Sequence, residues 1–496
     1  MKQRLVLSFL LLLLGGCDWI HSSFINGIPF NGNSDHETHV YVGLDGVAHH
    51  TMLKVMERGG FSGPDWHLAK FVTMFPATSD VSWTRILHTE PIPSYEMEYY
   101  DPTADSIRNK GIASLIRHIF PTLTEGIDFE NQYMKAFDYR ANGYLHGFHA
   151  YGDTYTSLSD SLDNFFVTLE GQMQTRTSYS AYLVEFDVLG HMAPSEEDVI
   201  RALKDLSRRI EAFKSRNPRR RVKFTFLSDH GMDFVPVSGE KLIRMENELG
   251  RVNIDSVESL RDIRSGHISA IPIRHTRVSY ISLHTTPEMS DEVALRTSSL
   301  PSVEMTIARL QASPGSVVAP PNTQWFGIWK DGRLAITFGF DPAHDHYLVG
   351  ETVGGMLRDL QVQIGNRAAN GEFVSLSDDE AFAITKNGNY PDLFYRARTG
   401  LAQQGILYPG DVLVSFKVGY ASVGFSLLGN DMVSISGFHG AMNALSSNGI
   451  LLSNERTLPD TVRSDTFFQL FPNMKEHMKK RGLRFYDGDP NESLMY

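Results

Sequence analysis

Three aspartates and three histidines of this sequence stand at, or shortly after, the ends of short apolar runs. They are Asp45, Asp187, His191, Asp229, His230 and His439. Oxygen and nitrogen donors of this kind bind borderline divalent ions, Zn²⁺ first and Mn²⁺ as an alternative, where thiolates are absent. Six ligands exceed one tetrahedral site, so the set predicts two ions. Two ions about 4 Å apart can hold the attacking and leaving oxygens of an in-line displacement at phosphorus.

Two of the motifs place a glycine beside the ligand positions. They read Asp187-Val188-Leu189-Gly190-His191 and Ser228-Asp229-His230-Gly231-Met232. Glycine tolerates tight backbone bends that other residues resist. We therefore expect Gly190 and Gly231 to permit turns that direct the neighbouring carboxylates and imidazoles toward one ion.

The same chemistry requires a hydroxyl group against one of the ions. The segment 74–84 supplies candidates in Thr78 and Ser79, where a hydrophobic stretch ends and a short helix is expected to begin. Metal coordination lowers the pKa of such a hydroxyl, and a helix N-terminus favours the transferred anion.

Four apolar runs rich in β-branched or aromatic residues are expected to form the strands that carry these side chains. They are 40–44, 181–186, 224–227 and 432–435. Nearly continuous apolar runs are typical of parallel strands covered on both faces, so we expect an α/β fold with a mainly parallel sheet between helices. In such sheets ligands collect beyond the carboxyl ends of the strands, where these side chains should converge.

Helical patterns lie between and after the expected strands. Apolar positions from Val199 to Phe213 keep a helical period. Asp101-Pro102 predicts an N-cap followed by proline, with an apolar helix face continuing to Ile119. The segment 465–484 predicts a C-terminal helix with a lysine-rich last turn, which suits the negative end of a helix.

The pattern changes in the middle of the chain, where we expect an inserted α+β cap. Within it we expect a strand at 277–283, a hairpin at 324–338 turning at Asp331-Gly332, and a helix at 378–384. The expected organisation is a signal peptide at 1–16, a tether at 17–36, a catalytic core at 37–270, the cap at 271–410, and a return to the core with the C-terminal helix at 411–496.

The N-terminus has the pattern of an export signal. Lys2 and Arg4 precede the apolar run 5–14, which is too short to span a bilayer. The residues that follow, Gly15-Gly16-Cys17, resemble a bacterial lipoprotein signal, which implies cleavage before Cys17 and a diacylglycerol on its sulfur. The polar stretch up to about residue 36 suits a flexible tether. We therefore expect a body anchored by lipid to the bacterial envelope, facing the periplasm or the cell exterior.

Composition excludes several classes of protein. The chain has 496 residues, 42% of them hydrophobic and 21% charged, which argues against a disordered protein. Its 46 Lys and Arg against 58 Asp and Glu give a net charge of −12. A dedicated nucleic-acid binder normally carries a basic field, so no nucleic-acid partner is expected. The single cysteine, Cys17, excludes an intrachain disulfide.

The ordered motifs resemble those of the alkaline phosphatase superfamily. The shared features are a strand-end Asp, a Phe-Pro-x-x-Ser segment, Asp-x-x-Gly-His, Ser-Asp-His-Gly-Met and a late Gly-x-His-Gly, and they run from Asp45 to His439. Within the superfamily, the sequence is most similar to the type I phosphodiesterase and nucleotide pyrophosphatase branch. The cap shows no useful likeness.

The resemblance implies a role for each motif residue. One metal site would comprise Asp45, Ser79, Asp229 and His230, and the other Asp187, His191 and His439. The motif favours Ser79 over Thr78 as nucleophile. The implied mechanism is attack by Ser79 on a phosphoryl centre, followed by hydrolysis of a phosphoseryl enzyme by metal-activated water. We therefore expect a metal-dependent phosphodiesterase or phosphatase that acts on a small-molecule or lipid phosphate ester.

The nucleophile segment departs from the branch pattern. Val81 and Ser82 occupy the positions of a Pro-Asn pair whose Asn helps hold a phosphoryl oxygen. The Pro and Arg that sulfatases place after their nucleophile are also missing at the required offsets, with Arg85 too far along. A sulfatase, a phosphoryl-group transferase and a non-catalytic envelope lipoprotein remain alternatives. Monoester or diester specificity, inner or outer membrane and oligomeric state stay open.

Overall fold

The computed structural model describes most of the chain from Glu37 to Tyr486. The described residues are 37–95, 98–109, 132–140, 154–173, 175–235, 241–275, 278–311, 319–350, 373–403, 405–423 and 436–486. The predicted signal segment, Cys17, the tether and the predicted strand at 432–435 lie outside these residues.

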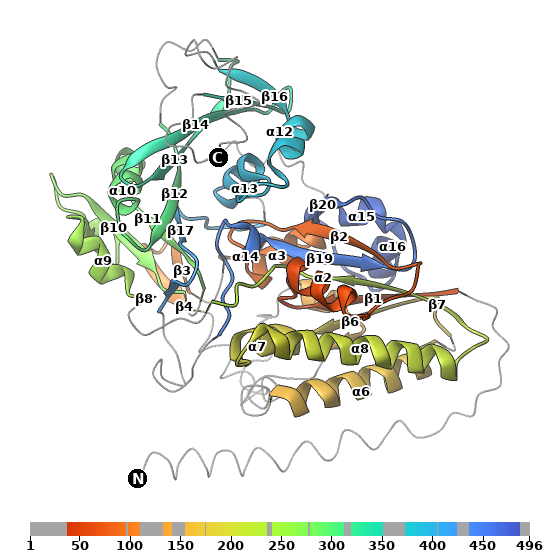
Figure 1. Ribbon diagram of the computed structural model, residues 1–496. Coiled ribbons are helices and arrows are strands. Elements are labelled where there is room, and N and C mark those ends of the chain that lie inside the picture. Colours follow the sequence, from red (N-terminus) through yellow and green to blue (C-terminus); the bar gives the residue numbers. More distant parts are fainter. Residues whose placement is uncertain are drawn as a thin grey trace, which may run out of the picture.

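A seven-stranded sheet forms the catalytic half of the molecule (Figure 1). Its order is β20 (Thr461–Arg463), β2 (His67–Val72), β19 (Asn448–Ser453), β7 (Arg221–Leu227), β1 (Glu37–Leu44), β6 (Ser178–Leu183) and β5 (Tyr139–Arg140). The pairings of β5, β6, β1 and β7 are parallel, as is that of β2 with β20, whereas β19 runs antiparallel to both neighbours. The expected α/β class with a mainly parallel sheet is confirmed.

Helices cover both faces of this sheet. Successive apolar side chains of a strand point to opposite faces, so each face forms an apolar core with the helices that pack on it. Val40, Val42 and Leu44 of β1 pack with one set of helices, and Tyr41 with the other. The first set is α2 (His49–Glu57), α6 (Thr154–Gln172), α7 (Glu185–Met192) and α8 (Glu196–Arg216). The second set is α3 (Ser79–Ile86), α15 (Phe467–Leu470) and α16 (Pro472–Lys480).

Helix α8 confirms the expectation drawn from periodicity. Ser195 and Asp198 form a capping box at its start, which satisfies backbone N–H groups that a helix end leaves free. The expected C-terminal helix, in contrast, is divided into a 3₁₀ turn η8 (Ser464–Thr466), α15 and α16. Pro472 has no N–H to continue α15, so a new helix begins there. The lysine-rich last turn is present in α16.

The helix expected to begin at Asp101 is wrong, because this segment forms a hairpin of β3 (Glu98–Asp101) and β4 (Ser106–Asn109). The Asp101 carboxylate accepts hydrogen bonds from the backbone N–H groups of Thr103 and Ala104, at 2.9 and 3.1 Å. An N-capping Asp makes the same contacts at a helix start, so they are compatible with a turn as well as with a helix. Asp105 then adopts a left-handed backbone with φ of 48°. The later part of the expected helix lies outside the described residues.

A second, nine-stranded sheet lies beside the first (Figure 1). Its order is β16 (Val374–Ser377), β15 (His346–Val349), β14 (Arg333–Asp341), β13 (Gln324–Lys330), β12 (Val303–Arg309), β17 (Val412–Phe416), β11 (Tyr280–His284), β10 (Ser269–Ile273) and β9 (Asp255–Ser256). The expected hairpin is β13–β14, and its turn residues Asp331 and Gly332 both have positive φ, 50° and 70°. Because β10 and β17 belong to this sheet, it reaches beyond the expected cap range of 271–410 at both ends.

Shorter elements complete the described structure. They are α9 (Met245–Arg251), α10 (Ser290–Thr297), α12 (Asp378–Thr385), α13 (Leu393–Gly400), α14 (Ala444–Ser447), the paired strands β8 (Leu242–Ile243) and β18 (Ala421–Ser422), and the 3₁₀ turns η4 (Gln132–Ala136), η6 (Leu260–Asp262) and η7 (Pro287–Met289). Helix α12 matches the helix expected at 378–384. Among the described helices, none has both the length and the apolar character needed to cross a bilayer.

The second sheet and its helices support the segment that leads to Ser79. Phe75 shares an apolar core with Phe338 of β14 and Leu393 of α13. The guanidinium of Arg396, buried in α13, donates hydrogen bonds to the backbone oxygens of Met442 and Met74, at 3.0 and 3.3 Å. These contacts hold together two loops that lead toward the candidate site.

Candidate metal centre

The expected side chains converge at the carboxyl edge of the seven-stranded sheet. Asp45 directly follows β1, and Asp229 follows β7 after one serine. Because β1 pairs in register with β7 and β6, these strand ends lie side by side. The convergence expected from the four apolar runs is therefore observed for the three runs that lie among described residues.

One group of possible metal ligands comprises Asp45, Asp229 and His230. The Nε2 atom of His230 lies 3.5 Å from an Asp45 oxygen and 3.4 Å from an Asp229 oxygen. The hydroxyl of Ser79 donates to the same Asp45 oxygen at 3.2 Å and lies 3.3 Å from His230 Nε2. Ser79 thus adjoins this group as expected.

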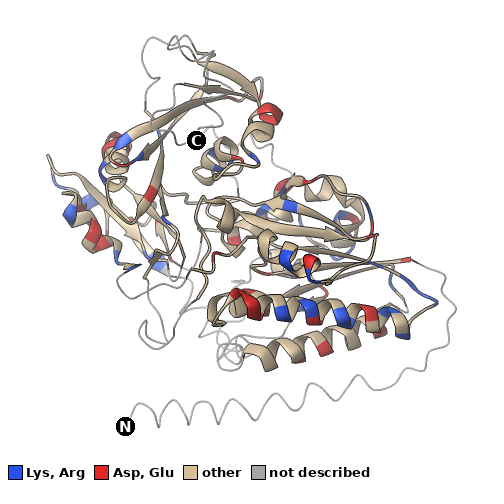
Figure 2. Ribbon diagram, in the orientation of Figure 1, with Lys and Arg blue, Asp and Glu red and all other residues tan. Residues whose placement is uncertain are grey.

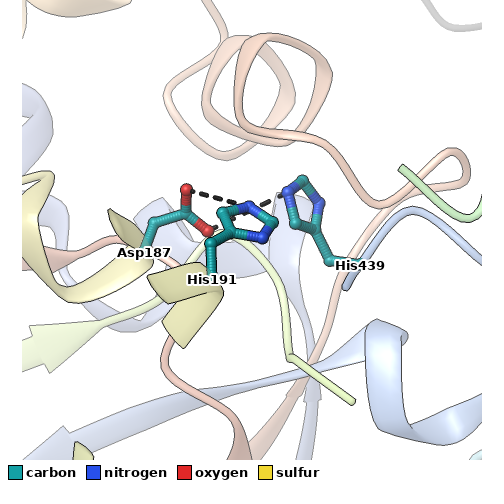
Figure 3. A group of neighbouring side chains, drawn as sticks. All are labelled: Asp187, His191 and His439. Atoms are coloured by element: carbon teal, nitrogen blue, oxygen red, sulfur yellow. Dashed lines mark ion pairs between the residues drawn. The ribbon is translucent and has the colours of Figure 1, made fainter. Parts of the chain in front are cut away.

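The second group comprises Asp187, His191 and His439 (Figure 3). The Nε2 atom of His191 lies 3.4 Å from one Asp187 oxygen, and that of His439 lies 3.9 Å from the other. The expected strand ends at Leu183, so Asp187 and His191 occupy adjacent turns of α7 rather than a tight turn. Gly190 lies inside this helix, where an added Cβ would approach Met232 to 2.8 Å. The expected turn role of Gly190 is therefore wrong, and close packing is the reason for a glycine here.

The two groups touch each other. The rings of His230 and His439 stack with centroids 3.8 Å apart, and His230 Nε2 lies 3.9 Å from an Asp187 oxygen. Gly46, with φ of 68°, lies between the groups, because its N–H donates to Asp229 at 3.2 Å while an added Cβ would lie 2.7 Å from Asp187. The six side chains therefore form one cluster made of two adjoining groups, each of which could hold a metal ion.

Backbone carbonyl groups fix the orientation of all three imidazoles. The Nδ1 atoms of His191, His230 and His439 lie 2.8–2.9 Å from the carbonyl oxygens of Gly437, Gly231 and Ala77. A carbonyl oxygen only accepts, so each Nδ1 carries the proton and donates. Each Nε2 lone pair is then directed at the carboxylates, which is the arrangement that metal-binding histidines adopt.

The charge of the cluster indicates that it is built for cations. Among the described residues, histidines are the only basic side chains within ion-pair distance of Asp45, Asp187 and Asp229. One buried oxygen of Asp187 and one of Asp229 accept no hydrogen bond. Buried carboxylates are costly unless they are paired or bind metal. The donor set therefore fits divalent ions.

The pKa directions differ within the cluster, and that of Asp45 reflects the excess of negative charge. Burial, followed by the charges of Asp229 and Asp187, raises the pKa of Asp45 well above its ordinary value. Burial opposes ionisation of Asp187, but His191 and His439 hold its pKa below the ordinary range. Burial and the neighbouring His230 lower the pKa of His439, which favours the neutral ligand form.

The structure separates the two candidate hydroxyl groups. Thr78 is buried and donates to the backbone oxygen of Tyr95 at 3.4 Å, whereas Ser79, the first residue of α3, lies in the cluster. Of the pair, Ser79 alone contacts the carboxylates and imidazoles of the cluster. Val81 and Ser82 are buried in α3, and the Ser82 hydroxyl makes no hydrogen bond.

Tyr182 is a site residue that sequence reasoning missed. Its hydroxyl donates to the second oxygen of Asp45 from the neighbouring strand β6. The ring is fixed between Trp83 and Phe137, with ring centroids 5.5 and 5.2 Å away. The only sequence signal was the alternation of side chains along β6, which predicts the face of the sheet on which Tyr182 lies but not that it contacts Asp45.

Residues 62–310 match the sequence model of the type I phosphodiesterase / nucleotide pyrophosphatase family. The chain belongs to this family. It is therefore an enzyme that hydrolyses phosphoric ester bonds, within a family whose members depend on metal. No curated protein matches the chain in sequence.

Solved structures with a similar fold include murine and human ectonucleotide pyrophosphatase / phosphodiesterase 5. The murine structure has 10% sequence identity and a TM-score of 0.44, and the match covers 90% of this chain and 96% of that one. An inactive variant of the murine protein, in complex with AMP, has 11% identity, the same coverage and a TM-score of 0.43. The human structure has 11% identity, coverage of 88% and 95%, and a TM-score of 0.43.

Proposed function

We propose that this protein is a two-metal phosphodiesterase that uses Ser79 as its nucleophile. The observation that carries the proposal is the position of Ser79 Oγ, 3.2 Å from Asp45 and 3.3 Å from His230, at the edge of a cluster of six oriented ligands. Membership of the phosphodiesterase family supports the same chemistry.

In this proposal, each of the two groups of side chains holds one ion. Asp45, Asp229 and His230 would hold one ion beside Ser79, and Asp187, His191 and His439 the other. Bound there, divalent ions lower the pKa of a hydroxyl nucleophile and offset the charge of the phosphoryl group. Zinc is the proposed metal, with manganese as the alternative, because the ligands are oxygen and nitrogen atoms only.

The residues of the chain then orient the displacement. Ser79 Oγ forms a bond to phosphorus while the bond from phosphorus to the leaving ester oxygen breaks on the opposite side. As the first residue of α3, Ser79 also brings the phosphoryl oxygens to the N-terminus of that helix, whose free N–H groups favour anions. Water later breaks the bond between Oγ and phosphorus, which regenerates Ser79 and releases the phosphate product.

Replacement of the two neighbouring hydroxyl residues tests the proposal. Ser79→Ala is expected to lower kcat for a chromogenic phosphodiester by about 10⁴-fold or more, because the nucleophile is lost. Thr78→Ala is the matched control and should keep most activity, since its hydroxyl contacts only the Tyr95 backbone oxygen. Ser79→Thr retains a hydroxyl and should retain measurable turnover.

Turnover of a phosphodiester, a phosphomonoester and a sulfate ester, measured side by side, decides the ester class. Phosphodiester turnover well above monoester and sulfate ester turnover supports a diesterase, whereas the reverse order would replace that assignment. Full activity of Ser79→Ala, with Thr78→Ala inactive, would refute the proposed nucleophile.

We also propose that the enzyme acts outside the cytoplasm, held to the envelope by a lipid on Cys17. The sequence pattern around Gly15-Gly16-Cys17 supports this location. Metabolic labelling with a radioactive fatty acid, compared between the natural chain and Cys17→Ser, tests it. Equal labelling of the two proteins would contradict the anchor.

A further inference from the structure

The edge of the seven-stranded sheet opposite the metal centre is rich in Lys and Arg. Strands β1, β6 and β7 all begin there, because they run parallel from this edge toward Asp45 and Asp229. At about 3.3 Å per residue, the eight residues of β1 separate the two edges by about 25 Å.

Two sequence segments and one arginine make this amino edge basic, and we call them the basic edge. They are the segment 216–223, which leads from α8 into β7, the segment 475–484, which includes the end of α16, and Arg176, just before β6. Together they hold eleven Lys and Arg side chains and one acid, Glu476, although the whole chain has a net charge of −12. Figure 2 shows the basic residues of the turn between α8 and β7.

The parts of the basic edge are brought together by the fold. Arg221 pairs in register with Glu37 at the start of β1, whose other side pairs with the start of β6. Arg176 and Arg481 both reach the carboxylate of Asp138, which joins α16 to this edge.

A hollow of about 770 Å³ opens in the middle of the basic edge. Its lining includes the basic residues Arg176, Lys480 and Arg481, the histidine His477, and the three acids Glu37, Asp138 and Glu476. Arg176, Lys480 and Arg481 are exposed residues, and two of them, Arg176 and Arg481, share the carboxylate of Asp138. The acids and the Lys and Arg of the lining balance in formal charge, so the hollow can admit a polar headgroup and the basic segments around it favour an anionic one.

The predicted lipid anchor connects to the same edge. Glu37 begins β1 at the basic edge, and twenty residue steps separate it from Cys17. At no more than about 3.6 Å per residue, this segment spans at most about 70 Å. An anchored body therefore stays near the bilayer, and its charges can decide which side faces the lipids.

We propose that the basic edge docks on an anionic phospholipid bilayer, with the hollow taking a lipid headgroup. The metal centre then faces away from the membrane and receives water-borne substrate. Lys and Arg side chains near an anionic surface each strengthen membrane binding by about fivefold. Salt should weaken the interaction, since exposed charges are screened.

Vesicle binding tests the surface independently of catalysis. The protein used is the mature chain from position 17 with Cys17→Ser, which lacks the lipid but keeps every described element. It should bind vesicles of phosphatidylcholine mixed with phosphatidylglycerol and bind pure phosphatidylcholine weakly. Equal binding to both would overturn the proposal.

Two triple variants remove equal charge from opposite parts of the molecule. Lys479→Gln, Lys480→Gln and Arg484→Gln together should weaken binding to the anionic vesicles by about 100-fold. The control replaces three exposed arginines on the second-sheet side, with Arg251→Gln, Arg264→Gln and Arg333→Gln. Hydrolysis of a soluble phosphodiester should be unchanged in both. Equal loss of binding in the two variants would show that net charge alone, not the basic edge, attracts the protein.

A single introduced cysteine then reports the orientation, because Cys17→Ser removes the natural one. A dye on Asn473→Cys, in the hollow, should be quenched by lipids that carry a nitroxide. A dye on Leu445→Cys, whose backbone lies against Gly231 near the metal centre, should not. Stronger quenching at position 445, or equal quenching at both positions, would overturn the orientation.

Discussion

Tyr182 provides the most direct test of how the metal centre is held. Its hydroxyl donates to one oxygen of Asp45, and Ser79 donates to the other. Tyr182 is buried, and its ring is held by Trp83 and Phe137. The change Tyr182→Phe removes this hydrogen bond and keeps the ring.

The expected magnitude follows from the charge of the acceptor. A hydrogen bond to a charged group contributes about 1.5–3 kcal/mol, and loss of an outer-shell partner typically lowers metal affinity by about 10–100-fold. The two ranges agree, since a tenfold change corresponds to about 1.4 kcal/mol. Without Tyr182, the Asp45 carboxylate can rotate within a buried site. We expect this loss of orientation to outweigh any gain in basicity of its oxygen.

Calorimetric titration of the metal-free protein with Zn²⁺ measures this effect without reference to activity. The Tyr182→Phe protein should bind one of two ions about 10–100-fold more weakly, and excess metal should restore most of kcat. Tyr179→Phe is the matched control, because Tyr179 lies in the same strand, faces the other core and has a buried hydroxyl with no hydrogen bond. Unchanged or tighter metal binding by Tyr182→Phe would refute the reasoning.

Three further expectations concern stability. Arg463→Gln should lower the free energy of unfolding by about 3–5 kcal/mol, measured by urea denaturation, because it leaves the buried carboxylate of Asp392 without its bidentate partner at 2.6 and 2.9 Å. Burial opposes ionisation of Asp138, but His477 and Arg481 hold its pKa below the ordinary value. The ionised carboxylate should therefore stabilise the folded state fully above about pH 4 and progressively less as the pH falls further. The stability difference between the natural chain and Asp138→Asn should therefore shrink as pH falls, and a constant difference would contradict the assignment. Chelation of metal should lower the melting temperature, since an ion at 100 times its Kd stabilises the folded state by about 2.7 kcal/mol, and the Ser79→Ala protein should retain most of this dependence.

Local patterns predicted the elements whose structure depends on neighbours in sequence. Helix α8 follows from the apolar period between Val199 and Phe213, and the β13–β14 hairpin from Asp331-Gly332. The hairpin at Asp101 was not predicted, because the same Asp-Pro pair suits a helix start, and the turn is set by the pairing of β3 with β4 and by the left-handed backbone of Asp105.

The sequence by itself determined the types and order of the candidate metal ligands and the strands that deliver Asp45 and Asp229, because apolar runs that end at charged residues carry that information locally. The motif favoured Ser79 over Thr78, and the tertiary structure shows that Ser79 adjoins the cluster. Tertiary structure alone decided that α7 presents Asp187 and His191 and that Tyr182 holds Asp45. These outcomes depend on contacts between residues far apart in the chain. Such contacts form only when strands pair and helices pack, and no local pattern encodes which side chains they bring together.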